Sequence, residues 1–130
     1  MTIVRRCVGV ALASAPVALI LASMASDVRA SSAPRLALLL AGSAMAIALF
    51  NIWLAFGRPR YLRWRNPAGK FPHVSLIPGI GTVLAVLASL LGSGMPGVSI
   101  VSLLAVVLDV GGFPWVVIWA WRNQSLWRPR

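Results

Sequence analysis

The sequence predicts an all-α integral membrane protein, built as a bundle of four transmembrane helices. The chain has 130 residues, of which 59% are hydrophobic. Its apolar residues gather into four runs, each close to the roughly 20 residues that a helix needs to cross a bilayer. Only polar or Gly/Pro-rich stretches separate these runs, so we expect a single domain over residues 1–130. We place the helices at about residues 7–25, 36–56, 74–91 and 98–121.

The basic residues predict one orientation. The chain has 12 Lys and Arg against 2 acidic residues, a net charge of +10. All of the basic residues except Arg29 and Arg35 precede the first run, follow the last, or lie in a loop over residues 57–73. Because positive charge is retained on the cytoplasmic side, both termini and this loop should be cytoplasmic in a bacterial inner membrane.

The first run has a second interpretation. Arg5 and Arg6 before it, and Ser23-Met24-Ala25 at its end, also fit a cleavable signal peptide. The run is longer than the usual apolar part of such a peptide, so we expect residues 1–25 to be retained, and cleavage stays open as the alternative.

Small residues recur at helical spacing in every run and form one stripe along each helix. The stripes are Ala11, Ala15, Ala18, Ala22 and Ala25; Ala37, Ala41, Ala44, Ala48, Asn51 and Ala55; Gly81, Ala85, Ala88 and Gly92; and Ser102, Ala105, Asp109 and Gly112. Small side chains let helix backbones approach closely in lipid. We therefore expect a left-handed antiparallel bundle with these stripes inside, where they could also dock foreign helices. Asn51, Ser102 and Asp109 should then face the interior.

Helix-breaking residues interrupt the last two runs. In the third run they are Pro78, Gly79 and Gly81, and in the fourth they are Gly111, Gly112 and Pro114. Proline removes a backbone donor and clashes with the preceding turn. We expect the fourth helix to be kinked or broken near Asp109 to Pro114, opposite the weakened start of the third.

Asp109 is a lone carboxylate inside the fourth run, and an ionisable group at that depth is a candidate functional group by default. Paired broken helices around a carboxylate are typical of the ion or proton sites of transporters. The structural alternative is that Asp109 caps the resuming helix through the amide of Gly111 or Gly112, or bonds Asn51 or Ser102.

Aromatic residues occur only at position 50 or later, on the predicted cytoplasmic half. Residues 57–65 alternate Arg with apolar side chains, so we expect this stretch to lie flat on the membrane surface. The candidate lipid or partner interface comprises Arg58, Arg60, Tyr61, Arg63, Trp64, Arg65, Trp119, Trp121, Arg122 and Trp127. Because the basic clusters abut apolar runs, anionic lipid headgroups are expected as ligands and nucleic acid is not.

The composition argues against an enzyme. The chain has 1 His, 1 Cys and 2 acidic residues that lie far apart, Asp27 and Asp109. It has no carboxylate pair, no metal-ligand spacing and no phosphate-binding loop. We therefore expect no catalytic residues, no cofactor and no metal.

Two stretches carry a resemblance to a known group of proteins. The first runs from Pro72 to Pro78 and the second from Leu108 to Pro114. Over the second half of the chain they resemble small four-helix bacterial membrane proteins of the toxin-immunity type. Such proteins are often encoded beside secreted polymorphic toxins. The resemblance implies a protective role and no catalytic residues.

Three functional hypotheses follow. The first is a non-enzymatic inner-membrane protein that binds a membrane partner, such as an immunity protein against a membrane-active toxin. The second is a small ion- or proton-coupled transporter or channel subunit that uses Asp109, as a homo-oligomer. The third is a lipid-binding membrane assembly factor.

Overall fold

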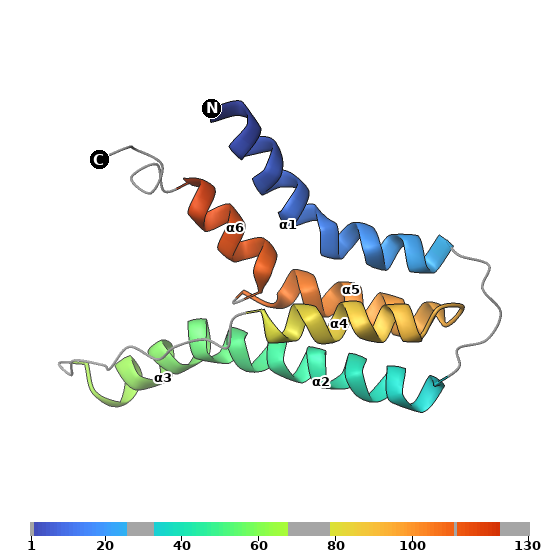
Figure 1. Ribbon diagram of the computed structural model, residues 1–130. Helices are drawn as coiled ribbons and strands as arrows, with labels where there is room; N and C mark the ends of the chain where they lie inside the picture. The colour runs from blue at the N-terminus through green and yellow to red at the C-terminus, as the bar shows by residue number, and fades with distance from the viewer. Residues whose placement is uncertain (1, 26–32, 68–78, 111, 123–130) are drawn as a thin grey trace.

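A computed structural model describes residues 2–25, 33–67, 79–110 and 112–122 (Figure 1). These residues form helices joined by turns, which confirms the all-α class. The elements are α1 (Thr2–Ala25), α2 (Pro34–Ile52), the π-helical turn η1 (Trp53–Gly57), α3 (Arg58–Arg65), α4 (Ile80–Leu91), α5 (Pro96–Leu108) and α6 (Phe113–Arg122). By length and hydropathy, two helical stretches of the described chain could cross a membrane, Cys7–Ala25 and Pro34–Arg65.

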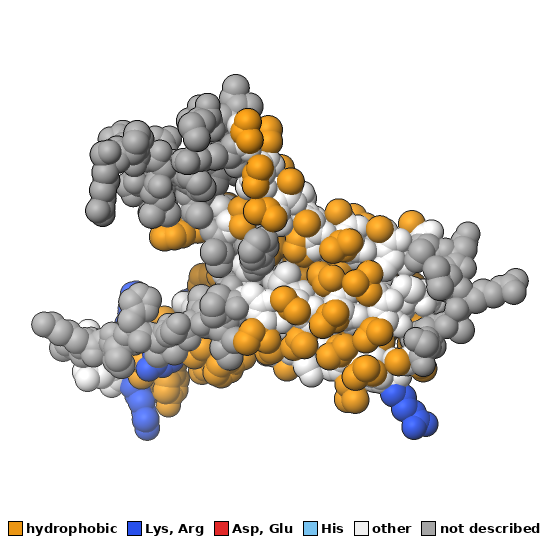
Figure 2. All heavy atoms as spheres, viewed as in Figure 1, with side chains coloured by type: hydrophobic (Ala, Val, Ile, Leu, Met, Phe, Trp, Pro, Cys, Tyr) orange, Lys and Arg blue, Asp and Glu red, His pale blue; other side chains and the backbone are white. Residues whose placement is uncertain are grey.

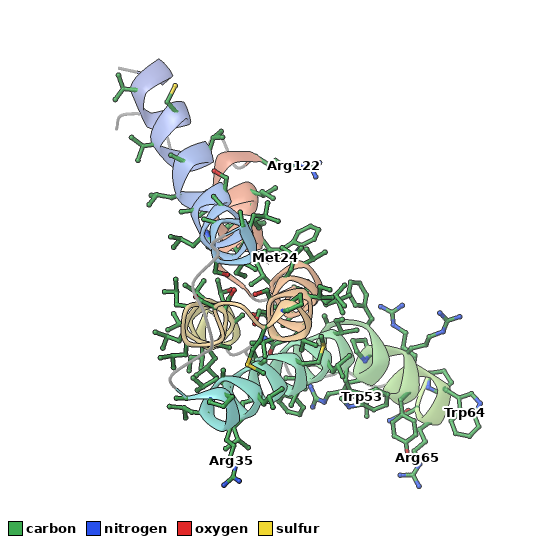
Figure 3. The ribbon with its side chains drawn as sticks, turned by 90° about the vertical axis from the view of Figure 1, so that its right-hand side faces the viewer. Met24, Arg35, Trp53, Trp64, Arg65 and Arg122 are labelled. Atoms are coloured by element: carbon green, nitrogen blue, oxygen red, sulfur yellow. The ribbon has the colours of Figure 1, made fainter. Side chains whose placement is uncertain are left out.

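The helices are arranged in layers, with α4 and α5 side by side between α1 and α2 (Figures 1 and 3). A tight turn joins α4 to α5, and Gly94 in it has φ of 83°, a conformation that glycine adopts without strain. α5 begins at Pro96, where a missing backbone donor costs nothing. This turn, the end of α1 and the start of α2 lie at one end of the bundle, so consecutive spans are antiparallel, whereas the contacting pairs α1 with α4 and α2 with α5 run parallel (Figure 1).

The interior consists mainly of small side chains. On α2 the buried residues are Ala37, Ala41, Ala44, Ala48 and Asn51. On α4 and α5 they include Ala85, Ala88, Ser102 and Ala105. The predicted stripes of the second, third and fourth runs therefore pack against one another, while large apolar side chains cover much of the outside (Figure 2).

The predicted stripe of the first helix was wrong. Ala11, Ala18, Ala22 and Ala25 are exposed, and among the α1 side chains that the structure describes the buried ones are Pro16, Ile20 and Ser23. Since the small residues of α2, α4 and α5 already interlock, α1 packs beside them with a larger side chain, and Ile20 joins the core around Ala85 and Ala105.

Residues 57–65 were predicted as part of a loop and are helical instead. The α2 helix continues through η1 into α3 and forms one rod over Pro34–Arg65. Pro59 does not end this rod because it lies in the first turn of α3, where proline is tolerated. α3 therefore does not lie as a separate flat segment, and it extends beyond the bundle (Figure 1).

Candidate functional site: a buried Asp–Asn pair at the helix breaks

Asp109 follows Leu108, the last residue of α5, and is the C-cap of this helix. Its φ and ψ of −72° and 85° leave the helical region, and its backbone N–H donates to the Ala105 carbonyl at 2.9 Å. Its own carbonyl accepts a hydrogen bond from the Gly112 N–H at 2.7 Å. α6 resumes at Phe113, with Pro114 in its first turn, and turns away from α5 (Figure 1). Gly111 and Pro78, two of the predicted helix breakers, lie outside the described residues.

The side chain of Asp109 pairs with Asn51. Both side chains are 0% exposed, and Asn51 Nδ2 donates to Asp109 Oδ1 at 2.6 Å. Of the partners considered from the sequence, Asn51 is the one that the carboxylate bonds. Ser102 is also buried, but its hydroxyl has no hydrogen-bond partner among the described residues, and the Gly112 amide bonds the main chain of Asp109.

The second carboxylate oxygen has no partner. Asp109 Oδ2 is buried and accepts no hydrogen bond from the described residues. A Cβ atom built on Gly81 would lie 2.8 Å from it, and one built on Gly112 would lie 2.9 Å from it. The two glycines therefore provide the space that the carboxylate occupies.

Oxygen atoms converge beside Gly112. The position of its hypothetical Cβ lies 2.8 Å from the Asp109 carbonyl oxygen, 2.9 Å from Asp109 Oδ2 and 2.9 Å from Thr82 Oγ1. Thr82 is 3% exposed and comes from the first turns of α4. A main-chain carbonyl, a carboxylate and a hydroxyl thus approach one small volume, at the C-terminal end of a broken helix. The end of α5 carries partial negative charge, and the starts of α4 and α6, which also lie here, carry partial positive charge.

The helices of the bundle depart from regular geometry near this level. The π-helical turn begins at Trp53, two residues after Asn51, and the N-cap residue of α4, Gly79, has φ of 77°. Pro16 lies inside α1. The hydrogen bond between Ser23 of α1 and Ser89 of α4 fixes how these two helices are aligned. Pro16 lies two turns before Ser23, and Thr82 lies two turns before Ser89, so Pro16 and Thr82 lie at the same height along the bundle. π-helical turns inside helices occur often at functional sites.

A separate cluster of hydroxyls lies toward the α4–α5 turn. Ser89 Oγ is hydrogen-bonded to Ser23 Oγ of α1, and it lies 3.1 Å from Ser99 Oγ of α5. Ser23 also donates to the Ile20 carbonyl at 2.7 Å. Sequence reasoning missed this cluster. The sequence signal for it was Ser89, which directly follows Ala88 of the small-residue stripe on α4.

The predicted lipid or partner residues do not form one surface. Those on α3 have no buried side chain, and Trp64 is 80% exposed. Within α3, the Arg65 guanidinium lies 5.9 Å from the centre of the Tyr61 ring. Arg122 and the exposed Trp119 lie on α6, away from the tip of α3 (Figure 3). The Trp121 side chain and Trp127 lie outside the described residues.

An open apolar groove separates α1 from α4. It has a volume of about 630 Å³, and its walls include Leu12, Ala15 and Leu19 of α1 and Ile80, Val83 and Leu87 of α4. Pro16 and Thr82 also line it, so the groove reaches the level of Asp109. Ala15 lines the groove and also belongs to the Ala stripe of α1, so the exposed part of that stripe lies along the outer edge of the groove.

The chain matches no protein-family model, no curated protein and no solved structure. In the described part of the chain, no three His, Cys, Asp or Glu residues lie close enough to hold a metal ion together. The resemblance to toxin-immunity membrane proteins stays a prediction.

Proposed function

We propose that this chain is a non-enzymatic, four-span protein of the bacterial inner membrane that works by binding a helix of a membrane partner. The distribution of side chains supports the membrane part of the proposal. The interior holds mainly Ala, Gly and Ser together with the Asn51–Asp109 pair, whereas outward positions carry large apolar residues such as Leu39 at 68% exposure and Phe56 at 63%. Monomeric water-soluble proteins rarely expose large apolar patches, whereas lipid accommodates them.

The charges support an orientation with both ends of the chain in the cytoplasm. The start of α1, the α3 helix and the end of α6 lie at one end of the bundle, and α3 carries four arginines there. Arg35 lies at the opposite end, at the start of α2. α5 and α6 together form the fourth span, broken at Asp109. α3 extends past the apolar part of its rod, where its arginines meet anionic headgroups.

The observation that carries partner binding is the groove between α1 and α4. It is open, nearly all of its walls are apolar, and one edge continues as the exposed stripe Ala11, Ala18, Ala22 and Ala25. Acyl chains can fill an apolar groove, but small residues at helical spacing specifically favour close approach of another helix backbone. The occupant that fits both features is a transmembrane helix. A membrane-active toxin would supply one, and holding it in the groove would prevent its assembly into a pore.

The stripes of α2, α4 and α5 are not available for this role, because they are buried within the bundle. The expectation that all four stripes could dock foreign helices is therefore limited to α1.

Site-directed crosslinking in native membranes tests the proposal. Cysteine placed at Ala18, in a Cys7→Ser background, should crosslink a membrane protein that co-purifies in stoichiometric amounts. Ala18→Leu and Ala22→Leu should abolish co-purification, because the added bulk holds the partner backbone away. Ala46→Leu is the matched control, since Ala46 is an exposed small residue of α2. If the control variant and the α1 variants retain the partner equally, the groove does not bind it.

A further inference from the structure

We propose that the first half of α1 and the whole of α6 form one arm, which pivots at Pro16 and at the break after α5 and so sets the width of the groove between α1 and α4. Figure 1 shows that α1 changes direction in its middle, and that α6 turns away from α5 and follows the first half of α1. The arm consists of residues 2–15 and of α6. Each of its two helices continues into the bundle at one pivot.

The pivot in α1 has two causes. Pro16 lies inside the helix and supplies no N–H to the carbonyl of Leu12, one turn earlier. The hydroxyl of Ser14 donates to the Val10 carbonyl at 2.8 Å and lies 3.2 Å from the Ala11 carbonyl. A serine that bonds the preceding turn often bends a helix. Both features weaken α1 at the same turn.

The second pivot lies at the same height along the bundle. Pro16 is level with Thr82, as the hydrogen bond between Ser23 and Ser89 shows. Thr82 Oγ1 lies 2.9 Å from the hypothetical Cβ of Gly112, which is at the break before α6. Hinges are formed by a few residues at the ends of helices that absorb the backbone rotation. Because the two breaks are level, the two helices of the arm can rotate together without sliding past each other.

The arm has packing of its own but little hold on the core. A Cβ built on Gly9 would lie 3.9 Å from Val117 Cγ1, and α6 packs on α1 more extensively than on any other helix. None of the described side chains of the arm is buried, whereas Ile20 and Ser23 anchor α1 in the bundle beyond Pro16. Segments with few buried contacts open at a low free-energy cost.

Trp115 is a positioning residue for the arm. Its indole N–H, from the start of α6, donates to the Val107 carbonyl in the last turn of α5 at 3.2 Å. This hydrogen bond spans the break and favours one angle between the two helices. The indole is 44% exposed, so the bond can open without disturbing the core.

The groove lies across the pivot. Leu12 and Ala15 of the arm line one wall, Ile80 and Val83 of α4 line the other, and Leu19 lies on the bundle side of Pro16. A swing of the arm therefore moves Leu12 and Ala15 relative to α4 and leaves Leu19 in place. That this movement admits a partner helix rests on the proposed function, but the movement itself does not.

Spin-label distances in the purified full chain, in lipid nanodiscs and without a partner, provide the test. All labels are placed at exposed positions in a Cys7→Ser background. The distance distribution between Val8→Cys on the arm and Leu49→Cys on α2 should be at least about twofold wider than that between Leu21→Cys and Leu49→Cys. The pair Val8→Cys and Trp119→Cys should be as narrow as the second pair, because both labels lie on the arm.

Variants identify the pivot and the bond that holds it. Pro16→Ala restores the missing N–H and should narrow the Val8–Leu49 distribution to that of the Leu21–Leu49 pair. Pro34→Ala is the control, since this proline lies in the first turn of α2. Trp115→Phe keeps a ring but removes the N–H, and should widen the distribution further, whereas Trp119→Phe, at another exposed tryptophan of α6, should not.

Thiol crosslinking measures the groove itself. Crosslinkers of two different spans should both join Leu12→Cys to Ile80→Cys in the otherwise unchanged chain, and only one of them should do so when Pro16→Ala is added. Equal widths for the Val8–Leu49 and Leu21–Leu49 pairs, or no effect of Pro16→Ala, would overturn the proposal even if a partner co-purifies. Conversely, loss of the proposed partner binding leaves these distances unaffected, so the two proposals fail separately.

Discussion

The hydrogen bond between Asn51 and Asp109 should be the most costly polar contact to remove. Asn51 Nδ2 lies 2.6 Å from Asp109 Oδ1, and both residues are 0% exposed. Since Oδ2 has no partner among the described residues, Asn51→Ala leaves the buried carboxylate without the one side-chain donor it has. The substitution also removes the hydrogen bond that joins α2 to the break between α5 and α6.

The size of the effect can be bounded. Hydrogen bonds between membrane helices contribute about 0.6 kcal/mol on average and up to about 1.7, while a bond to a charged group contributes about 1.5–3 kcal/mol. Stabilities of about 0.05–0.15 kcal/mol per residue give this 130-residue chain roughly 6–20 kcal/mol. We therefore expect Asn51→Ala to lose about 2–3 kcal/mol and still fold.

A double-mutant cycle measures the pair itself. Asn51→Ala, Asp109→Ala and the double variant would be unfolded with denaturant in micelles and followed by tryptophan fluorescence. The coupling energy should reach about 1 kcal/mol or more, because each single variant removes the same bond. Ser102→Ala is the control, and its effect should be within about 0.5 kcal/mol, since its hydroxyl has no described partner to lose. Additive losses for Asn51 and Asp109, within about 0.3 kcal/mol, would refute the reasoning.

The remaining predictions concern the two ends of the molecule. Ser89→Ala removes the hydroxyl that joins α1, α4 and α5, and should lower the free energy of unfolding by about 1–2 kcal/mol, whereas Ser14→Ala, at an exposed serine bonded only within α1, should cost less than about 0.5. Replacing the four α3 arginines with Gln should reduce co-purifying anionic lipid in native mass spectrometry, because each basic residue near the surface contributes about 1 kcal/mol. Arg35→Gln, at the other end, should leave this lipid unchanged. Equal lipid loss in both variants would exclude a specific role for α3.

The break in the fourth run and the buried face of α2 were predictable because they follow from local rules. Glycines are poor helix formers, and Pro114 has no N–H to donate, so the hydrogen-bond ladder of α5 does not continue past Asp109. Small residues at spacings of three and four, from Ala37 to Asn51, lie on one face of α2, and this is the face that is buried. A carboxylate and an amide on such faces are then drawn together, because each lowers the cost of burying the other.

What the sequence could not decide depended on packing between helices. The Ala stripe of α1 satisfies the same rule as that of α2, but only three stripes can interlock in this bundle, and α1 is left outside with Ile20 and Ser23 inward. The rod through α3 was missed because Pro59 resembles a helix end. Its position in the first turn of α3, with η1 before it, allows the chain to continue.

The geometry also separates the two interpretations of Asp109. As an N-cap of the resuming helix, its carboxylate would accept the Gly112 amide, but the main-chain carbonyl of Asp109 takes that amide at 2.7 Å. As the hydrogen-bond acceptor for Asn51, the Asp109 side chain uses only Oδ1. The other carboxylate oxygen, Oδ2, lies against Gly81 and Gly112, where a Cβ atom at either position would come within 2.9 Å of it. The two glycines therefore leave room for the second oxygen while Asn51 binds the first, and the start of α4 at Gly81 offers that second oxygen partial positive charge.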